Sequence, residues 1–327
     1  MQSSTHSISC LSCGSKHIKF WANARDLEYF TSQDTFSYYL CHKCGVLFID
    51  PVPRDHLSKI YPPNYYSFTP NKKSWIHRIK NLMDRKAFQK ILRNLPGDSL
   101  NILDVGGGEG WHLSLLKDLD LRIRITQLVD IDPDASDLAQ SQGHQYFCGR
   151  IEDFNTCEKF DLVLLLNLIE HVESPQHVLA KIRSLLSPQG VILVQTPNYD
   201  SWDAQLFRHL NWGGYHCPRH WVLFTKNSFK RIIEQVGLKI RRADYIQGAS
   251  FWASSILFLL AKYRLISITA KKPAIYHPLT SPLMAIFALF DMVRVPFSKT
   301  SQMFFIIGHG VETANGQKTK LRENQSS

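Results

Sequence analysis

Two pairs of cysteines near the N-terminus have the spacing of a metal site. Cys10 and Cys13 form one CxxC pair, and Cys41 and Cys44 form a second. Two such pairs can supply four thiolates to one tetrahedral zinc ion, and a shell of four protein ligands leaves no position for a catalytic water. The segment is too short to hold a core alone. We therefore expect a structural zinc that folds a small N-terminal ribbon.

A glycine-rich turn follows an apolar run at NILDVGGGEG, residues 101–110. Its pattern after Asp104 is DxGxGxG, whereas a nicotinamide dinucleotide fingerprint would be GxGxxG. Glycines between a strand and a helix let a ligand contact the backbone at the carboxyl edge of a parallel sheet. Asp130 ends the next apolar run, and a carboxylate there can accept hydrogen bonds from both ribose hydroxyls. The expected ligand is a nucleoside, with or without a phosphate.

Strand-like and helix-like segments alternate around this turn. The apolar runs predict strands buried on both faces of a parallel sheet, with helices between them. Predicted strands are 101–105, 124–131, 160–167, 191–197, 239–246 and 301–310, and predicted helices are 110–119, 133–143, 174–190 and 225–238. The pattern indicates an α/β fold.

Residues 96–245 resemble the class I S-adenosylmethionine-dependent methyltransferases. The resemblance rests on four motifs in register: ILDVGGGEG, LVDIDPDASDLAQSQG, KFDLVLLLNLIEHV and LLSPQGVILVQTPN. It implies S-adenosylmethionine as cofactor and a Rossmann-like seven-stranded sheet in the order 3-2-1-4-5-7-6, with strand 7 antiparallel. With its N-terminal zinc ribbon, the chain is similar to methyltransferases of polysaccharide and natural-product pathways.

The resemblance also assigns the cofactor-binding residues by position. The glycine turn would line the methionine and ribose, the end of the second strand would hold the ribose, and the RIED turn at 150–153 would border adenine. The residue that ends the fourth strand would face the methionine. The implied set is Asp104, Gly106, Gly107, Gly108, Gly110, Asp130, Ile131, Ile151, Glu152 and Asn167.

A candidate base follows the fourth predicted strand. NLIEHV places Glu170 and His171 at the functional edge of the sheet, and this looks like the EHV of ubiquinone-pathway O-methyltransferases and of zinc-ribbon sugar methyltransferases. An acceptor hydroxyl or acidic carbon needs a base within reach, and His171 is the first candidate. The alternative is that both residues only cap the next helix. His220, in the loop NWGGYHCPRHWVLFT, is a further catalytic candidate or a residue that lines the pocket.

Charge and composition limit the partners without choosing one. The net charge is +10, from 38 basic and 28 acidic residues, which favours nucleic acid, acidic glycans or an anionic membrane face. Residues 72–95 predict a basic amphipathic helix, which can lie on such a surface or pack on the main domain. CxxC pairs and an N-terminus without an apolar leader indicate the cytoplasm.

An apolar insertion separates the last two predicted strands. Residues 249–298 contain two apolar segments interrupted by charges at Lys262, Arg264, Asp291 and Arg294, so a spanning helix is not expected. Three interpretations remain: a lid over the acceptor site, a hairpin docked on the membrane surface, or a dimer face. The oligomeric state stays open.

The expected organisation has five segments. They are a zinc ribbon and connector at 1–62, a basic amphipathic linker helix at 63–95, the S-adenosylmethionine-binding core at 96–248, the apolar helical insertion at 249–298, and the last strand with a polar tail at 299–327.

The expected function is methyl transfer from S-adenosylmethionine to oxygen or carbon of a sugar, glycolipid or related small molecule. The absence of [DN]PP[YF] after the fourth strand argues against N-methylation of adenine or glutamine. The acceptor is free or lipid-linked, and the protein is cytoplasmic, either free or peripheral on the membrane. An RNA methyltransferase that holds RNA with the ribbon and basic helix is the alternative, which the apolar insertion fits poorly. A third alternative is a non-catalytic, cofactor-binding scaffold.

Overall fold

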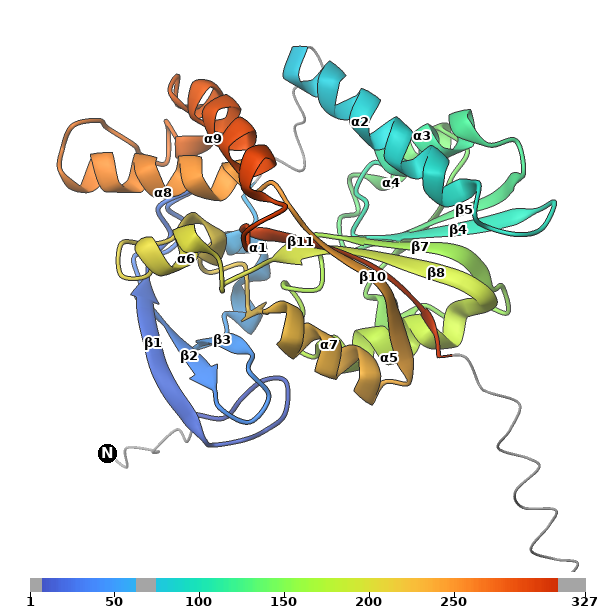
Figure 1. The fold of residues 1–327 in the computed structure, drawn as a ribbon, viewed down its shortest axis with the longest axis horizontal. Helices are drawn as coiled ribbons and strands as arrows, with labels where there is room; N and C mark the ends of the chain where they lie inside the picture. Colours follow the sequence, from blue (N-terminus) through green and yellow to red (C-terminus); the bar gives the residue numbers. More distant parts are fainter. Residues whose placement is uncertain (1–7, 63–74, 311–327) are drawn as a thin grey trace, which may run out of the picture.

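A computed structural model of the chain describes residues 8–62 and 75–310. Its centre is a seven-stranded sheet in the order β10-β11-β8-β7-β4-β5-β6 (Figure 1). The strands are β4 (Leu100–Val105), β5 (Ile123–Asp130), β6 (Gln145–Cys148), β7 (Phe160–Leu166), β8 (Leu186–Pro197), β10 (Leu238–Ile246) and β11 (Gln302–His309). Only β11 runs antiparallel to its neighbours. Numbered along the chain, this is the predicted order 3-2-1-4-5-7-6, which is confirmed.

Helices cover both faces of the sheet, as Figure 1 shows. On one face lie α2 (Trp75–Leu92), α3 (Trp111–Leu119) and α4 (Ser136–Ser141), and on the other lie α5 (Pro175–Leu185) and α7 (Lys226–Gln235). The central strand β7 is therefore buried on both sides, and Leu162 to Leu165 are fully inaccessible. This explains why its sequence is a continuous apolar run.

Two helix boundaries follow local sequence signals, and one differs from the prediction. Ser174 caps α5 by accepting from the backbone N–H of His177, and Thr225 forms a capping box with Ser228 at α7. The helix expected over 174–190 ends at Leu185, where β8 begins. Leu186 already pairs with Phe160 of β7, so sheet pairing overrides helix propensity there.

The basic helix packs on the core in its described part. Residues 63–74 of the predicted linker segment lie outside the described residues, as do 311–327 of the predicted tail. Phe88 and Leu92 of α2 are buried against the α3 side of the sheet, whereas Lys86, Lys90 and Arg93 are exposed. The contacts match a helix that packs on the main domain and shows a solvated basic face.

The N-terminal strands form a second sheet, and one strand of this sheet comes from the main domain. Its order is β1 (Ile18–Ala24), β2 (Phe36–Cys41), β3 (Leu47–Asp50) and β9 (Val222–Leu223), all antiparallel. Strand β9 comes from the loop after β8, so the two parts of the chain share one sheet. A short connector with η1 (Arg54–His56) and α1 (Leu57–Ile60) follows β3.

The predicted apolar insertion is a helical hairpin. Helices α8 (Ala249–Lys262) and α9 (Thr280–Arg294), with η4 (Ala274–Tyr276) between them, connect β10 to β11 along the chain. Figure 1 shows them beside the short α6 (Trp202–Leu206). Across the described ranges, no helix combines the length and apolar character that crossing a membrane requires.

Candidate active site and zinc site

The glycine turn forms a cradle without side chains between β4 and α3. Gly106, Gly108 and Gly110 have φ values of +75°, +54° and +83°, in the left-handed region that favours glycine. A Cβ on Gly107 would lie 2.4 Å from Oδ2 of Asp104, so no side chain fits there, whereas a Cβ on Gly108 would meet no atom within 4 Å. The open space beside Gly108 is where a ligand can approach the backbone.

Two carboxylates flank this turn. Asp130, at the end of β5, accepts hydrogen bonds from the backbone N–H groups of Gly108 at 2.8 Å and Asp132 at 3.0 Å, and burial raises its pKa. Asp104 is buried, and within the described residues its Oδ2 has no hydrogen-bond partner; Nδ1 of His112 lies 3.7 Å away. A buried acceptor without a donor is costly unless a ligand supplies one, so it is Oδ2 of Asp104 that has room for a hydrogen bond from a bound nucleoside.

The remaining predicted cofactor residues follow the ends of neighbouring strands. Ile131 is 55% exposed, Ile151 is buried at the start of η2 (Ile151–Asp153), and Glu152 is exposed. Asn167 has φ +57°, and its Oδ1 accepts from the side-chain amide of Gln302 on β11. Because the carboxyl ends of parallel strands share one edge, the structure gathers all ten residues along that edge.

The candidate catalytic cluster lies beyond β7. Glu170 is fully buried; its Oε2 accepts from Thr196 at 2.9 Å, and its Oε1 is 3.8 Å from Nε2 of His220. Burial raises the pKa of Glu170 to about 8, and burial, with the neighbouring histidines, lowers the pKa of His220. The carbonyl of Gly214 lies 2.9 Å from Nδ1 of His220, which places the proton on Nδ1 and leaves Nε2 facing Glu170.

His171 is half-buried, with its ring centroid 4.7 Å from that of His220. Burial lowers its pKa, and His216 and Arg219 lower it further. Such an imidazole is uncharged at neutral pH, so one of its ring nitrogens keeps a lone pair. Helix capping does not explain Glu170 and His171, because the next helix, α5, is capped by Ser174.

The N-terminal module contributes residues that the sequence analysis missed. The Tyr61 hydroxyl lies 2.9 Å from Nδ1 of His171, and Glu28 pairs with Nδ1 of His216. Asp26 and Arg219 form a fully buried ion pair at 3.0 Å. These partners are more than 100 residues apart in the chain, and no local pattern signals them. By contrast, three aromatic residues of the loop that carries His220 are buried in the core: Trp212, Tyr215 and Trp221.

The catalytic cluster also has a composition that suits a metal ion. The ligand atoms of Glu170, His171 and His220 lie within 4.8 Å of one another. Two imidazoles and a carboxylate are common ligands of transition metals. The same three side chains therefore offer either proton transfer or metal coordination.

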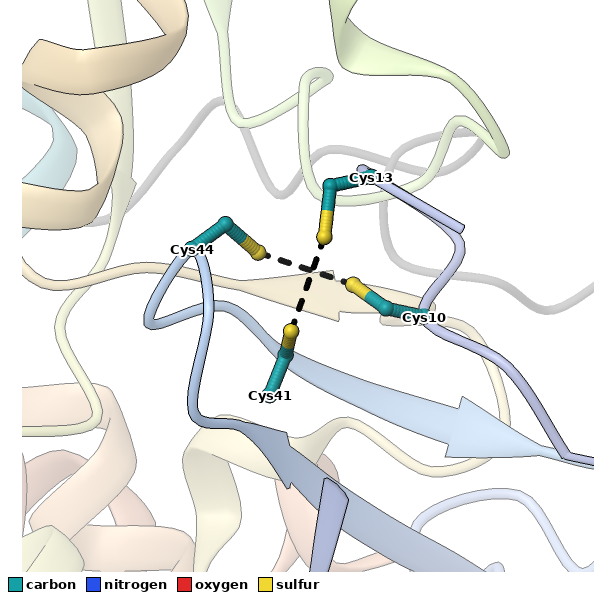
Figure 2. Close-up of side chains that lie close together, drawn as sticks. All are labelled: Cys10, Cys13, Cys41 and Cys44. Carbon is teal, nitrogen blue, oxygen red and sulfur yellow. Dashed lines mark hydrogen bonds between the residues drawn. The ribbon is translucent and has the colours of Figure 1, made fainter. Parts of the chain in front are cut away.

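The four N-terminal cysteines converge on one point, as Figure 2 shows. The Sγ atoms of Cys10 and Cys44 are 3.6 Å apart, as are those of Cys13 and Cys41. In each CxxC pair, the glycine that follows the second cysteine has a positive φ and donates its backbone N–H to the carbonyl of the first cysteine: Gly14 to Cys10, and Gly45 to Cys41. The two matching turns and four thiols fit a tetrahedral structural zinc.

About half of this chain is similar to known proteins. A family model described as a methyltransferase domain matches residues 77–243, just over half of the chain. The ubiquinone biosynthesis O-methyltransferase of Rhodopseudomonas palustris (strain BisB5) is 32% identical over 139 residues, which are 38% of this chain and 53% of that protein. Its counterpart in Bradyrhizobium sp. (strain ORS 278) is 34% identical over 117 residues, 33% of this chain and 44% of that protein. The chain thus matches about half the length of these relatives.

Among solved structures, a putative sarcosine dimethylglycine methyltransferase from Galdieria sulphuraria is similar with a TM-score of 0.49 and 12% identity, over 71% of this chain and 87% of that chain. The family match, the strand order and the glycine turn lead to one assignment. The chain belongs to the methyltransferase domain family and has the class I fold of the S-adenosylmethionine-dependent methyltransferases.

Proposed function

We propose that the protein transfers a methyl group from S-adenosylmethionine to an oxygen of a small-molecule acceptor, with His171 as the base. The observation that carries the proposal is the position of half-buried His171 beside Glu170 and His220, at the same sheet edge as the glycine turn. The relatives named above are O-methyltransferases, which supports oxygen over carbon.

The chain's own residues would perform three tasks. Asp104, Asp130 and the backbone around Gly108 hold the cofactor, which when bound supplies an activated methyl group for in-line displacement. His171 takes the proton of the acceptor hydroxyl as the oxygen–carbon bond forms. In the tautomer that donates Nδ1–H to the Tyr61 oxygen, Nε2 of His171 carries the lone pair that accepts this proton.

For the acceptor, we propose a sugar, a glycolipid or another hydroxylated compound linked to lipid. The zinc ribbon together with the EHV motif supports this class, because the chain resembles zinc-ribbon sugar methyltransferases in both. The apolar hairpin that emerges beside the active-site edge also suits a lipid-linked acceptor.

The acceptor class is tested by incubating the protein with methyl-labelled S-adenosylmethionine and fractionated cell extract. We expect label in the glycan or organic-solvent fraction, in a form that hydriodic acid releases as methyl iodide, as an O-methyl group requires. Label that resists this treatment would identify C-methylation. Label in RNA would contradict the proposal and support an RNA methyltransferase. Cofactor binding without any labelled product would support a scaffold.

The role of His171 is tested separately with His171→Ala. We expect kcat to fall by about 10²- to 10⁴-fold, the usual contribution of a general base, with cofactor affinity unchanged. His177→Ala, at an exposed histidine on α5, is the matched control. An unchanged kcat would remove His171 from the mechanism. Stimulation of the wild type by added Mg²⁺ or Mn²⁺ would instead assign Glu170, His171 and His220 to metal binding.

A further inference from the structure

Helix α9 exposes apolar side chains along its outer face. Ile286, Leu289 and Val293, which recur at helical spacing, are 60%, 65% and 67% exposed. Met292 is 58% exposed, and Phe297, just after the helix, is 88% exposed. A helix on the surface of a soluble protein normally turns polar residues outward. We call these five residues the outer face of α9. Their exposure indicates that this face contacts another molecule.

The opposite side of α9 is fixed to the protein, so the outer face is unable to rotate inward. Phe287 stacks on Trp252 of α8 with ring centroids 4.9 Å apart. Asp291 is fully buried and accepts from the backbone N–H of Gly248 at 2.7 Å and from Nε of Arg294 at 2.8 Å. The exposed apolar face is thus a feature of the folded hairpin.

The hairpin also carries an unbalanced positive charge. Residues 248–290 contain no aspartate or glutamate, and the one acid of the insertion, Asp291, is buried. Four exposed cations lie at the end of α8 and in the following loop: Lys262, Arg264, Lys271 and Lys272. Exposed Tyr263 and Leu265 alternate with two of them. Apolar and basic side chains without acids are the composition of a surface that meets anionic lipid.

The hairpin begins at the active-site edge of the sheet. It follows the end of β10, which runs parallel to β8, and it leads into the start of β11, where Gln302 contacts Asn167. Ser255 of α8 accepts from the backbone N–H of Gly213, in the loop that carries His220. Figure 1 shows α8 and α9 together at one side of the molecule, beyond this edge.

We propose that the 249–298 hairpin docks on an anionic membrane surface. The outer face of α9 enters the boundary between headgroups and acyl chains, and the four cations contact the headgroups. A second copy would offer another basic hairpin without exposed acids, so the charge of this surface favours anionic lipid over self-association. The docking does not depend on the enzymatic activity, whereas its purpose, access to a lipid-linked acceptor, rests on the proposed function.

The test is co-sedimentation of the full chain with vesicles of phosphatidylcholine alone and of phosphatidylcholine mixed with phosphatidylglycerol. We expect binding to the anionic vesicles that weakens as salt rises. Leu289→Glu with Val293→Glu, and separately Lys271→Glu with Lys272→Glu, should each weaken it about tenfold or more. The matched controls are Leu121→Glu, at a fully exposed leucine between α3 and β5, and Lys239→Glu, at an exposed lysine on β10.

Two results would overturn the docking proposal. One is that the wild type does not sediment with anionic vesicles, or that the hairpin variants sediment with them as well as the wild type does. The other is a wild-type dimer in analytical ultracentrifugation that Leu289→Glu with Val293→Glu converts to a monomer, which would assign the outer face to self-association. Cofactor binding by each variant verifies its fold. Vesicle binding without methyl transfer would refute only the proposed function, and methyl transfer without vesicle binding only the docking.

Discussion

The hydroxyl of Tyr61 lies 2.9 Å from Nδ1 of His171, so the connector after the zinc ribbon contacts the candidate base. The residue before it, Ile60, accepts a hydrogen bond through its carbonyl from Nε of the buried Arg219 at 2.5 Å. The N-terminal module is therefore part of the wall of the candidate active site. Changes in this module should alter catalysis as well as stability.

Tyr61→Phe tests that connection by removing the hydroxyl and keeping the ring. We expect kcat to fall roughly two- to tenfold, because one neutral hydrogen bond contributes about 0.5–1.5 kcal/mol. The KM for S-adenosylmethionine should not change. Steady-state kinetics provides the measurement, and Tyr39→Phe, at a half-buried tyrosine on β2, is the control. Equal kcat values in all three proteins would mean that this hydrogen bond does not orient His171.

The Asp26–Arg219 pair predicts a pH-dependent contribution to stability. Burial alone would raise the pKa of Asp26, but the charge and hydrogen bonds of Arg219 outweigh it and hold the pKa below the ordinary value of 3.8. The folded-state pKa is thus lower than the unfolded one. The contribution is fully present above about pH 4 and is lost as the pH falls through the folded-state pKa.

Asp26→Asn should lower the free energy of unfolding by about 3–5 kcal/mol at pH 7, because Arg219 is left buried without its counter-charge. The difference in the free energy of unfolding between Asp26→Asn and the wild type should become smaller below pH 4. Urea unfolding across this pH range measures both effects, with Asp34→Asn, at an exposed aspartate, as the control. A difference in unfolding free energy that stays constant with pH would show that Asp26 is not ionised in the folded protein.

Gly108→Ala should separate cofactor binding from folding. The backbone there is left-handed, which costs a side chain about 1–2 kcal/mol, but the new Cβ would meet no protein atom within 4 Å. It would occupy the space proposed for the cofactor, so we expect affinity for S-adenosylmethionine to fall about tenfold or more in calorimetric titration. Gly97→Ala, also at a positive φ but away from this turn, should fold with similar strain and bind normally.

Loss of the proposed zinc should unfold the N-terminal module and lower the methyl transfer rate with it. Cys44→Ser removes one of four thiolates, so we expect less zinc by elemental analysis and a lower melting temperature. Cys148→Ser, at an exposed cysteine on β6, should behave as the wild type. Full zinc content and an unchanged melting temperature in Cys44→Ser would contradict a four-cysteine site.

Much of the fold followed from local patterns in the sequence. The apolar runs predicted the strands because a buried parallel strand needs apolar residues on both faces, and the resemblance supplied their order, which is confirmed. Strand β6, with only four residues from Gln145 to Cys148, is too short to give a periodic signal. The glycine turn and the CxxC pairs were recognisable because their chemistry depends on neighbouring positions in the chain.

The sequence by itself determined six of the seven strands of the main sheet, the cofactor turn and the cysteine pairs, which are local properties. Only the tertiary structure decided that β9 joins the ribbon, that Tyr61 meets His171, and that Asp26 meets Arg219. It also decided that one apolar side of α9 is buried while the other faces outward. These relationships depend on which distant surfaces pack together, and burial sets the pKa shifts at the site, so no spacing along the chain encodes them.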